Sequence, residues 1–411
     1  MLPWSILPHL ITLGDLCDHC YMEEAKNAPL SFPGTPEQER FLTEAIVFHR
    51  SHPEVSLNQH ILNSSLFIGQ MIASRRRVYL DMKYWIICCE VILGRSREPK
   101  HQKLYDLLLR FVNEGKIICP ISDYCWLELF KQQDAKTLCA TARAIDQLSN
   151  GVCITFHHER IAIELLHFLR EKTPSGNAYP LVNLVWTRVS NAIGTAIGIN
   201  RFLPEGLSPP ESLAIKKALY DLRWNMSMSE IVRDLYNPQK ASRLSIDVSP
   251  LNEGRIAHAG EINSFYDAWN QELAGTVDIY VDTFRTVLEN YFGAPIDKIK
   301  IDDDIHKDVT KYFQSFIFAV FKQGKVTTEM PFINIQAGIH AATRWDKQRK
   351  IKANDIWDFG HAAAALPYYN LFLTENSLKH LVTSPPLCYD KLYGVKVIAD
   401  EDEAIAALES L

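Results

Sequence analysis

Acidic residues stand far apart along the chain at positions where a folded α/β protein would bring them together. These residues are Asp81, Glu128, Asp358 and Glu375. Clustered carboxylates repel one another unless cations lie between them, and carboxylate oxygens are the ligands that Mg²⁺ and Mn²⁺ prefer. The four positions therefore predict a site for Mg²⁺ or Mn²⁺, whose chemistry would be activation of water and stabilisation of charge on a phosphate.

Each acidic residue also has a purely structural interpretation. Asp81, at the end of an apolar run, is a candidate helix cap, and Glu128 on a helix is a candidate partner of a surface cation. Asp355 and Asp358 both stand near a helix start, where we expect Asp355 to be the cap and Asp358 the metal ligand. His361, one turn after Asp358, would contact the ligands or be a hydrogen-bonded core histidine, because hard cations rarely need imidazole.

A run of basic residues precedes the last acidic segment. It consists of Arg344, Lys347, Arg349, Lys350 and Lys352. Arg and Lys engage phosphate oxygens without reading sequence, so the run predicts a nucleic-acid contact beside the metal site. Its structural alternative is a solvated surface. Trp345 and Trp357 are candidates for stacking on unpaired bases, and Trp357 fits a core position equally well.

The cysteines offer a weak signal for a zinc site. Nine cysteines at irregular spacings imply reduced thiols rather than a disulfide framework. Cys17, His19 and Cys20 form a CxHC cluster, but a structural zinc site needs about four ligands and no second pair stands nearby.

The elements that must position the acids alternate between strands and helices. Short apolar runs at 78–81, 116–119, 152–155, 371–374 and 395–398 are strand-like, and helical patterns separate them. This order predicts a parallel sheet, and ligands of such sheets bind beyond the carboxyl ends of the strands. Asp81 and Glu375 stand at that edge.

The chain divides into three parts by pattern. Residues 1–75 form a helical N-terminal extension, residues 76–155 and 333–411 form the α/β core, and residues 156–332 form a helical insertion with long helices at about 209–236 and 261–291. We expect the insertion to bind a protein partner or a second copy of the chain.

Three segments resemble the PIN-domain nucleases. They are VYLDM around Asp81, ISDYCWLEL around Glu128, and NDIWDFGHAAAALPYYNLFLTENSLKHL from Asn354 to Leu381. The resemblance implies a PIN-like parallel sheet flanked by helices and a metal-dependent endoribonuclease whose products carry a 5′-phosphate and a 3′-hydroxyl. It also implies that Asp81, Glu128 and Asp358 are catalytic metal ligands, with Glu375 in place of a fourth aspartate.

The chain departs from that pattern at its last acidic positions. Glu375 is one methylene longer than aspartate, Asn376 is uncharged, and Asn370 stands where related sequences often place an acid. With Asp355 and His361, Asn370 is expected to surround the ligands. The departures keep open an alternative in which the protein is a catalytically degenerate PIN-like scaffold.

Composition and charge limit the partners that the protein can bind and the cell compartment in which we expect it. The formal net charge of −6 offers no overall attraction for a polyanion, so binding must be local. No groove-reading helix motif, phosphate loop or GxGxxG fingerprint is present, which favours single-stranded or structured RNA, or ssDNA, over duplex DNA. Charges interrupt every apolar run and no signal peptide is recognisable, so we expect no membrane span and a cytoplasmic location.

Overall fold

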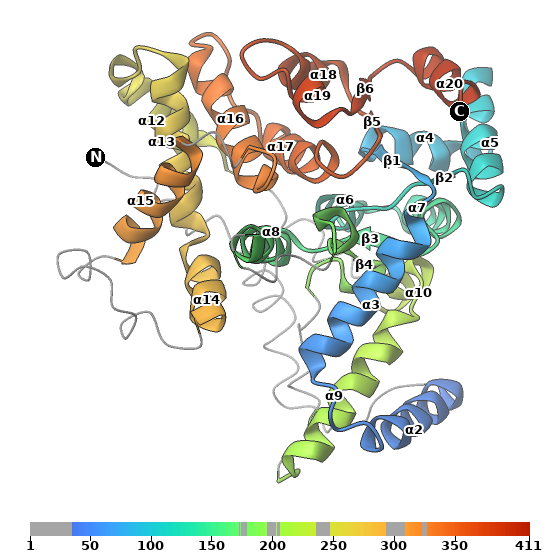
Figure 1. The fold of residues 1–411 in the computed structure, drawn as a ribbon. Coiled ribbons are helices and arrows are strands. Elements are labelled where there is room, and N and C mark those ends of the chain that lie inside the picture. The colour runs from blue at the N-terminus through green and yellow to red at the C-terminus, as the bar shows by residue number, and fades with distance from the viewer. Residues whose placement is uncertain are drawn as a thin grey trace.

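The computed structural model describes most of the chain (Figure 1). The described residues are 35–171, 173, 179–194, 203, 206–235, 247–292, 309–322 and 327–411. In these ranges no helix has both the length and the apolar character needed to cross a membrane. The CxHC cluster at Cys17, His19 and Cys20 lies outside them.

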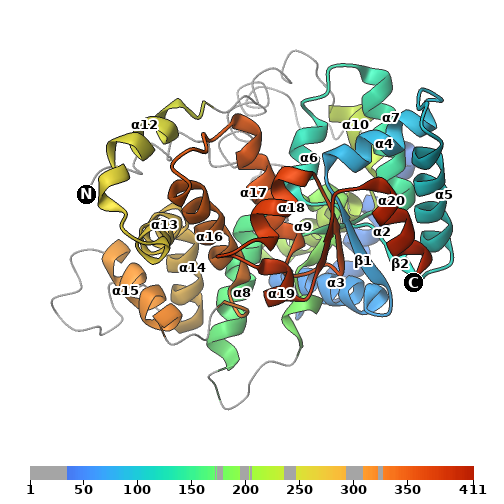
Figure 2. The same cartoon turned by 90° about the horizontal axis from the view of Figure 1, so that it is seen from above.

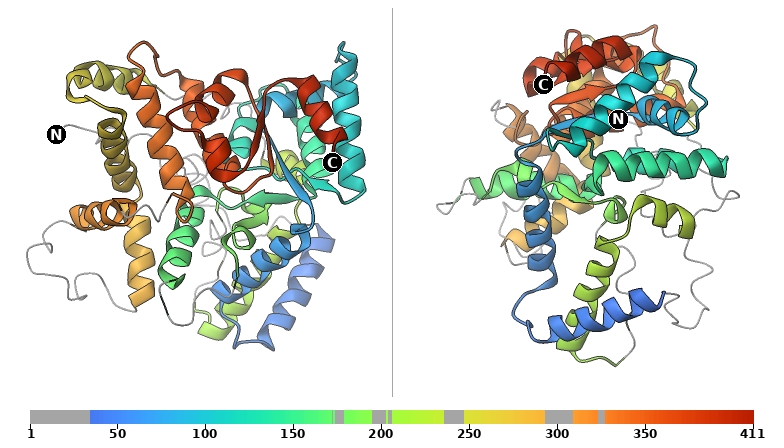
Figure 3. Two further views of the ribbon diagram at one scale, coloured as in Figure 1. Left: turned by 45° about the horizontal axis from the view of Figure 1, so that its top comes forward. Right: turned by 90° about the vertical axis from the view of Figure 1, so that its right-hand side faces the viewer.

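A small parallel sheet unites segments from both ends of the described chain. Its strands, in the order β2-β1-β5-β6, are β2 (Ile117–Ile118), β1 (Arg76–Leu80), β5 (Leu371–Leu373) and β6 (Lys396–Ile398). Every pairing is parallel, and Val78 of β1 lies opposite Leu371 of β5. The expectation that residues 76–155 and 333–411 contribute to one parallel sheet is confirmed for these strands (Figure 3, left).

The third predicted strand pairs differently from the expected pattern. β3 (Val152–Ile154) pairs antiparallel with β4 (Trp186–Arg188), and a single parallel bridge from Cys153 to Ile121 connects this pair to the chain after β2. β4 lies within the stretch predicted to be entirely helical, so that prediction is wrong at this point. A strand of three residues is too short to show an alternating pattern in the sequence.

Helices cover the sheet, and side chains at the strand ends begin several of them. The helices of this part are α4 (Met82–Ile92), α5 (Pro99–Asn113), α6 (Asp123–Leu129), α7 (Ala135–Ser149), α17 (Ala353–Ala365), α18 (Asn376–Thr383), α19 (Tyr389–Tyr393) and α20 (Glu401–Glu409). Asp81, Ser122 and Asp400 cap α4, α6 and α20 by accepting hydrogen bonds from backbone amides. Figure 2 shows α20 beside α5.

The insertion packs into the same core as the sheet. Its described helices are α8 (His157–Glu171), η3 (Leu181–Asn183), η4 (Val189–Asn191), α9 (Pro209–Trp224), α10 (Met228–Leu235), α12 (Ser249–Ala257), η6 (Ala259–Glu261), α13 (Phe265–Ile279), α14 (Val281–Phe292) and α15 (Val309–Lys322). α16 (Pro331–Trp345) follows them. The two long helices expected from the pattern are each interrupted, at Asn225 and at Tyr280. One continuous apolar cluster contains Leu273 of α13, Phe332 of α16 and Phe372 of β5.

The described part of the N-terminal extension is helical, as expected. α2 (Pro36–Arg50) begins with a capping box at Thr35, and α3 (Leu57–Ile72) begins at the capping residue Ser56. Both helices pack against α9 of the insertion. The right-hand view of Figure 3 shows these three helices below the sheet.

Candidate metal site at the carboxyl edge of the sheet

Asp81 follows β1 and is the N-cap of α4. Its carboxylate accepts a hydrogen bond of 3.0 Å from the backbone amide of Lys83, and the residue is 5% exposed. Burial raises the pKa of Asp81 to about 6; Glu375 also raises it, whereas Thr374 and His361 act to lower it. The cap and ligand interpretations of Asp81 are thus compatible, because the backbone contact uses only Oδ1.

Asp358 lies on α17 and faces the same group of charges. Burial raises the pKa of this carboxyl to about 7, and the negative charges of Asp81, Glu375 and Glu128 raise it further against the opposing effect of His361. The other three predicted acidic residues are therefore within electrostatic range of Asp358. They come from β1, α6, α17 and the end of β5, so the fold brings together residues separated by most of the chain.

Glu128 is held by two cations. His361 Nε2 donates to Glu128 Oε2 at 2.7 Å, and Lys131 Nζ lies 3.5 Å from Glu128 Oε1. Burial acts to raise the pKa of Glu128, but His361 and Lys131 outweigh it and hold the pKa below its usual value. Glu128 contacts His361 rather than pointing into solvent, and its negative charge is already balanced by His361 and Lys131.

The buried side chain of His361 bridges Glu128 on one side and the hydroxyl groups of Tyr79 and Ser122 on the other. Its Nδ1 lies 2.5 Å from the hydroxyl of Tyr79, which in turn lies 2.6 Å from Ser122 Oγ. Burial acts to lower the pKa of His361, but Cys125 and Glu128 raise it well above its usual value. As an imidazolium, His361 donates to both partners, and it cannot bind a metal in this state. This matches its expected place beside the ligands.

The spacing of the carboxylates limits how they can bind cations. In the described part of the chain, one group of three His, Cys, Asp or Glu side chains has ligand atoms that all lie within 4.8 Å of one another. That group is on other helices and includes none of the four acids. Opposite ligands of one Mg²⁺ ion are only about 4.2 Å apart, given bonds of about 2.1 Å. As the side chains stand, no three of the four acids are close enough to hold one ion directly, so an ion there would need water ligands or side-chain movement.

The residues expected around the ligands differ in their positions. Asp355 is the third residue of α17 and helps to cap the helix, because its carboxylate accepts from the backbone amide of the N-cap residue Lys352 at 2.8 Å; it also accepts from Arg349 at 3.1 Å. Asn370 precedes β5 and accepts from the backbone amide of Arg77 at 2.9 Å. It therefore lies at the amino end of the strands, opposite the acidic edge, and its expected place near the ligands is wrong. Glu375 follows β5 at the acidic edge and is exposed.

The predicted basic run divides into inward and outward residues. Arg344 is 8% exposed and forms an ion pair with Glu272 on α13, so it is not available to phosphate, contrary to expectation. Lys347, Lys350 and Lys352 are exposed. A cavity of about 130 Å³ is lined in part by Lys347, Arg255 and the exposed ring of Trp345.

Three contributors were not predicted. Lys131 pairs with Glu128 and lies over the ring of buried Trp357, 3.3 Å from its centroid. Lys131 lies in the turn after α6, and its spacing of three residues from Glu128 was the available signal. Thr374 lowers the pKa of Asp81, and Tyr79 orients His361. Nothing in the sequence around Tyr79 distinguishes it from an ordinary strand residue.

The chain was compared with models of protein families, with curated proteins and with solved structures, and none of the three comparisons gives a match.

Proposed function

We propose that this protein is a metal-dependent endonuclease that hydrolyses phosphodiester bonds in single-stranded or structured RNA. The observation that carries the proposal is the convergence of Asp81, Asp358 and Glu375, together with Glu128, at the carboxyl edge of a parallel sheet. That edge is where open α/β sheets bind their ligands. The resemblance of the same segments to PIN-domain nucleases supports the choice of reaction.

The donor set fits hard divalent cations. Asp81, Asp358 and Glu375 would hold Mg²⁺ or Mn²⁺, because carboxylate oxygens are their only side-chain donors. Bound there, the ions would activate water and stabilise the charge on the scissile phosphate. Glu128 adds negative charge while its own oxygens remain paired with His361 and Lys131. Lys131 also places a cation near Asp358.

The outward lysines supply the substrate contact. Lys350 and Lys352 precede α17, the helix that carries Asp358, so they lie within one or two turns of that helix's start. Exposed lysines bind phosphates without base selection. The exposed ring of Trp345 offers a stacking surface for an unpaired base. This combination favours a flexible single strand over a regular duplex.

A scaffold without catalysis is the competing function. The pairing of Glu128 with His361 and Lys131 favours it, because a carboxylate neutralised by two cations is a poor metal ligand. In that case the acidic edge would be a structural network, and the protein would bind a partner without cutting it.

Cleavage assays separate the two functions. Purified full-length protein is incubated with end-labelled RNA and ssDNA in Mg²⁺, Mn²⁺ or EDTA, alongside Asp81→Asn and Asp358→Asn. Asp106→Asn, an exposed aspartate on α5, is the matched control. We expect metal-dependent cutting of RNA by the parent and by Asp106→Asn, and at least a hundredfold loss in the other two variants. Absence of cutting by the parent, or full activity of Asp81→Asn and Asp358→Asn, would reject the nuclease proposal.

A further inference from the structure

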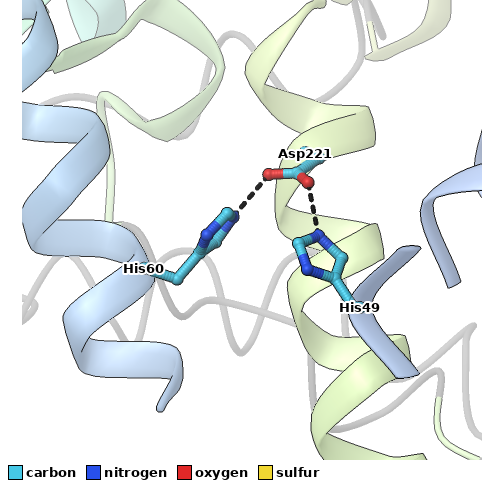
Figure 4. Close-up of side chains that lie close together, drawn as sticks. All are labelled: His49, His60 and Asp221. Carbon is cyan, nitrogen blue, oxygen red and sulfur yellow. Dashed lines mark hydrogen bonds and ion pairs between the residues drawn. The ribbon is translucent and has the colours of Figure 1, made fainter. Parts of the chain in front are cut away.

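Two histidines and an aspartate form a compact cluster on helices other than those that carry the acidic edge (Figure 4). His49 is in the last turn of α2, His60 is in the first turn of α3, and Asp221 is on α9. Their ligand atoms all lie within 4.8 Å of one another. Figure 4 shows the Asp221 carboxylate between the two imidazoles.

Each imidazole nitrogen lies against a different oxygen of the Asp221 carboxylate. His49 Nε2 lies 2.7 Å from Asp221 Oδ2, and His60 Nε2 lies 2.6 Å from Asp221 Oδ1. The two rings meet edge to face with centroids 4.9 Å apart. In a tetrahedral zinc site, bonds of about 2.0–2.1 Å place the ligand atoms roughly 3.3 Å apart. Small side-chain rotations that open each contact by roughly 0.6 Å would therefore admit an ion.

The two histidines and the aspartate interact electrostatically. Burial lowers the pKa of His49, and nearby His60 and Lys217 also lower it, against the effect of Asp221. Burial acts to raise the pKa of Asp221, but hydrogen bonds from His60 and His49 hold it below its usual value. Both histidines lie within hydrogen-bonding distance of the carboxylate, so a bound ion would take the place of the shared protons.

A buried lysine fixes the helices that carry the cluster. Lys217, one turn before Asp221 on α9, is fully buried, and its ammonium donates to the carbonyls of His52 and Val55 at 2.8 and 3.0 Å. These carbonyls belong to the loop between α2 and α3. Lys217 thus holds the loop against α9 and sets His49 and His60 on either side of Asp221 before any ion arrives.

The donor set and the exposure select the kind of ion. Imidazole nitrogens suit Zn²⁺ and its neighbours in the first transition row, whereas Mg²⁺ prefers an all-oxygen site. The side chains of His60 and Asp221 are 20% and 27% exposed, which leaves a path for the ion and a position for water as a fourth ligand. His49 is nearly buried at 3% and anchors the inner side.

We propose that His49, His60 and Asp221 form a zinc-class metal site that joins α2 and α3 to α9. This site is separate from the carboxylate edge and prefers a different class of ion. Because an ion that binds only the folded chain stabilises it, the site links occupancy to the attachment of the N-terminal helices.

Metal analysis of the full chain tests the site. Protein stripped with EDTA is dialysed against limiting ZnCl₂ with excess Mg²⁺, which occupies oxygen-rich sites, and bound zinc is measured. The parent is compared with the double variant His49→Gln/His60→Gln. The matched control is His52→Gln, because the His52 side chain contacts the backbone of Phe48 and not the cluster. We expect the double variant to lose one zinc equivalent per chain and His52→Gln to lose none.

A second measurement on the parent chain covers the case in which the double variant does not fold. Histidine modification by diethyl pyrocarbonate is mapped by mass spectrometry with and without Zn²⁺. Zinc should protect His60 and leave His52 reactive, and it should raise the melting temperature of the parent. If a folded double variant keeps all its zinc, or if zinc fails to protect His60, the three residues are only a hydrogen-bonded cluster and the proposal is overturned.

Discussion

At the scale of single residues, the carboxylates of the acidic edge repel one another, and the folded chain holds them together despite this repulsion. The pKa of Asp358 rises from 3.8 to about 7 because the carboxyl is buried among other carboxylates. An acid whose pKa is higher in the folded state binds its proton more tightly there than in the unfolded chain. Its ionisation therefore destabilises the fold as pH rises from about 4 to about 7.

Asp358→Asn should remove this destabilisation. In EDTA at pH 8 we expect the free energy of unfolding to increase by about 1–2 kcal/mol. The full rise in the pKa of Asp358 would imply more, at about 1.4 kcal/mol per pKa unit, but water reaches part of the side chain and reduces the effect. Near pH 4 the gain should vanish, since Asp358 is then protonated in the folded chain. Urea unfolding across this pH range measures the effect, with Asp106→Asn as the control. An equal gain at both pH values would contradict the raised pKa of Asp358.

At the scale of elements, His361 joins α17 to α6 through Glu128. Removing one partner of a buried ion pair leaves the other charge uncompensated, so His361→Ala should lower the free energy of unfolding by about 3 kcal/mol. Because the pKa of His361 is raised in the folded state, this contribution is full below its unfolded pKa and is lost only as pH rises through the raised value.

A double-mutant cycle with Glu128→Gln checks the assignment of that energy. If the two residues stabilise the fold through each other, the double variant should be less destabilised than the sum of the single variants. Strictly additive effects in urea unfolding would mean that the two side chains act independently.

The same two helices approach closely at a glycine. A Cβ on Gly360 of α17 would lie 2.1 Å from a ring carbon of Tyr124 on α6. Gly360→Ala should therefore cost about 1–3 kcal/mol by displacing α17, despite the better helix propensity of alanine. Gly254→Ala on α12, where a Cβ meets nothing within 4 Å, should be neutral or stabilising. The melting temperatures of the two variants are compared by thermal unfolding. Equal values would show that the ring of Tyr124 moves aside at no cost.

Strand and helix positions were predictable where the local pattern was strong. The apolar runs ending in Asp81 and Thr374 carried β propensity and were each followed by a change to helical period, so both strands appear where expected. The parts that sequence reasoning missed depend on distant partners. Arg344 looked like one of a basic run, and only the packing of α16 on α13 turns it toward Glu272. Asn370 precedes the strand that Glu375 follows, so the sequence already placed the two residues at opposite ends of that strand, and only the resemblance favoured a place near the ligands.

At the scale of the whole molecule, the insertion and the sheet share one core. Glu164 of α8 is buried and accepts from the hydroxyl of Tyr368 at 2.6 Å and from the backbone amide of Phe332 at 3.1 Å. Deleting residues 156–332 and joining the ends should therefore abolish cooperative folding. Circular dichroism and thermal unfolding of the shortened chain measure this. A sharp transition in that chain would show that the α/β core folds without the insertion.

The proposed RNA contact is also a property of the whole surface, because the net charge of −6 opposes a polyanion. Replacing Lys350 and Lys352 by alanine should weaken RNA binding and make it less dependent on salt, since fewer counterions are released. Lys136→Ala, an exposed lysine on α7, is the control. Filter binding across a salt series measures both effects, and an unchanged slope for the double variant would place the contact elsewhere.

The parallel pairing of β1 with β5 has a consequence for synthesis of the chain. Arg77 and Asn370, which meet at the start of this pairing, are 293 residues apart. At roughly 5–20 residues per second, a ribosome would need roughly 15–60 s to add the second strand after the first. Until then one edge of β1 has no partner, and its apolar residues Val78 and Leu80 lack the strand that buries them. The nascent chain is therefore exposed to misassociation for most of its own translation, and helper proteins that shield apolar segments would act on it in this interval.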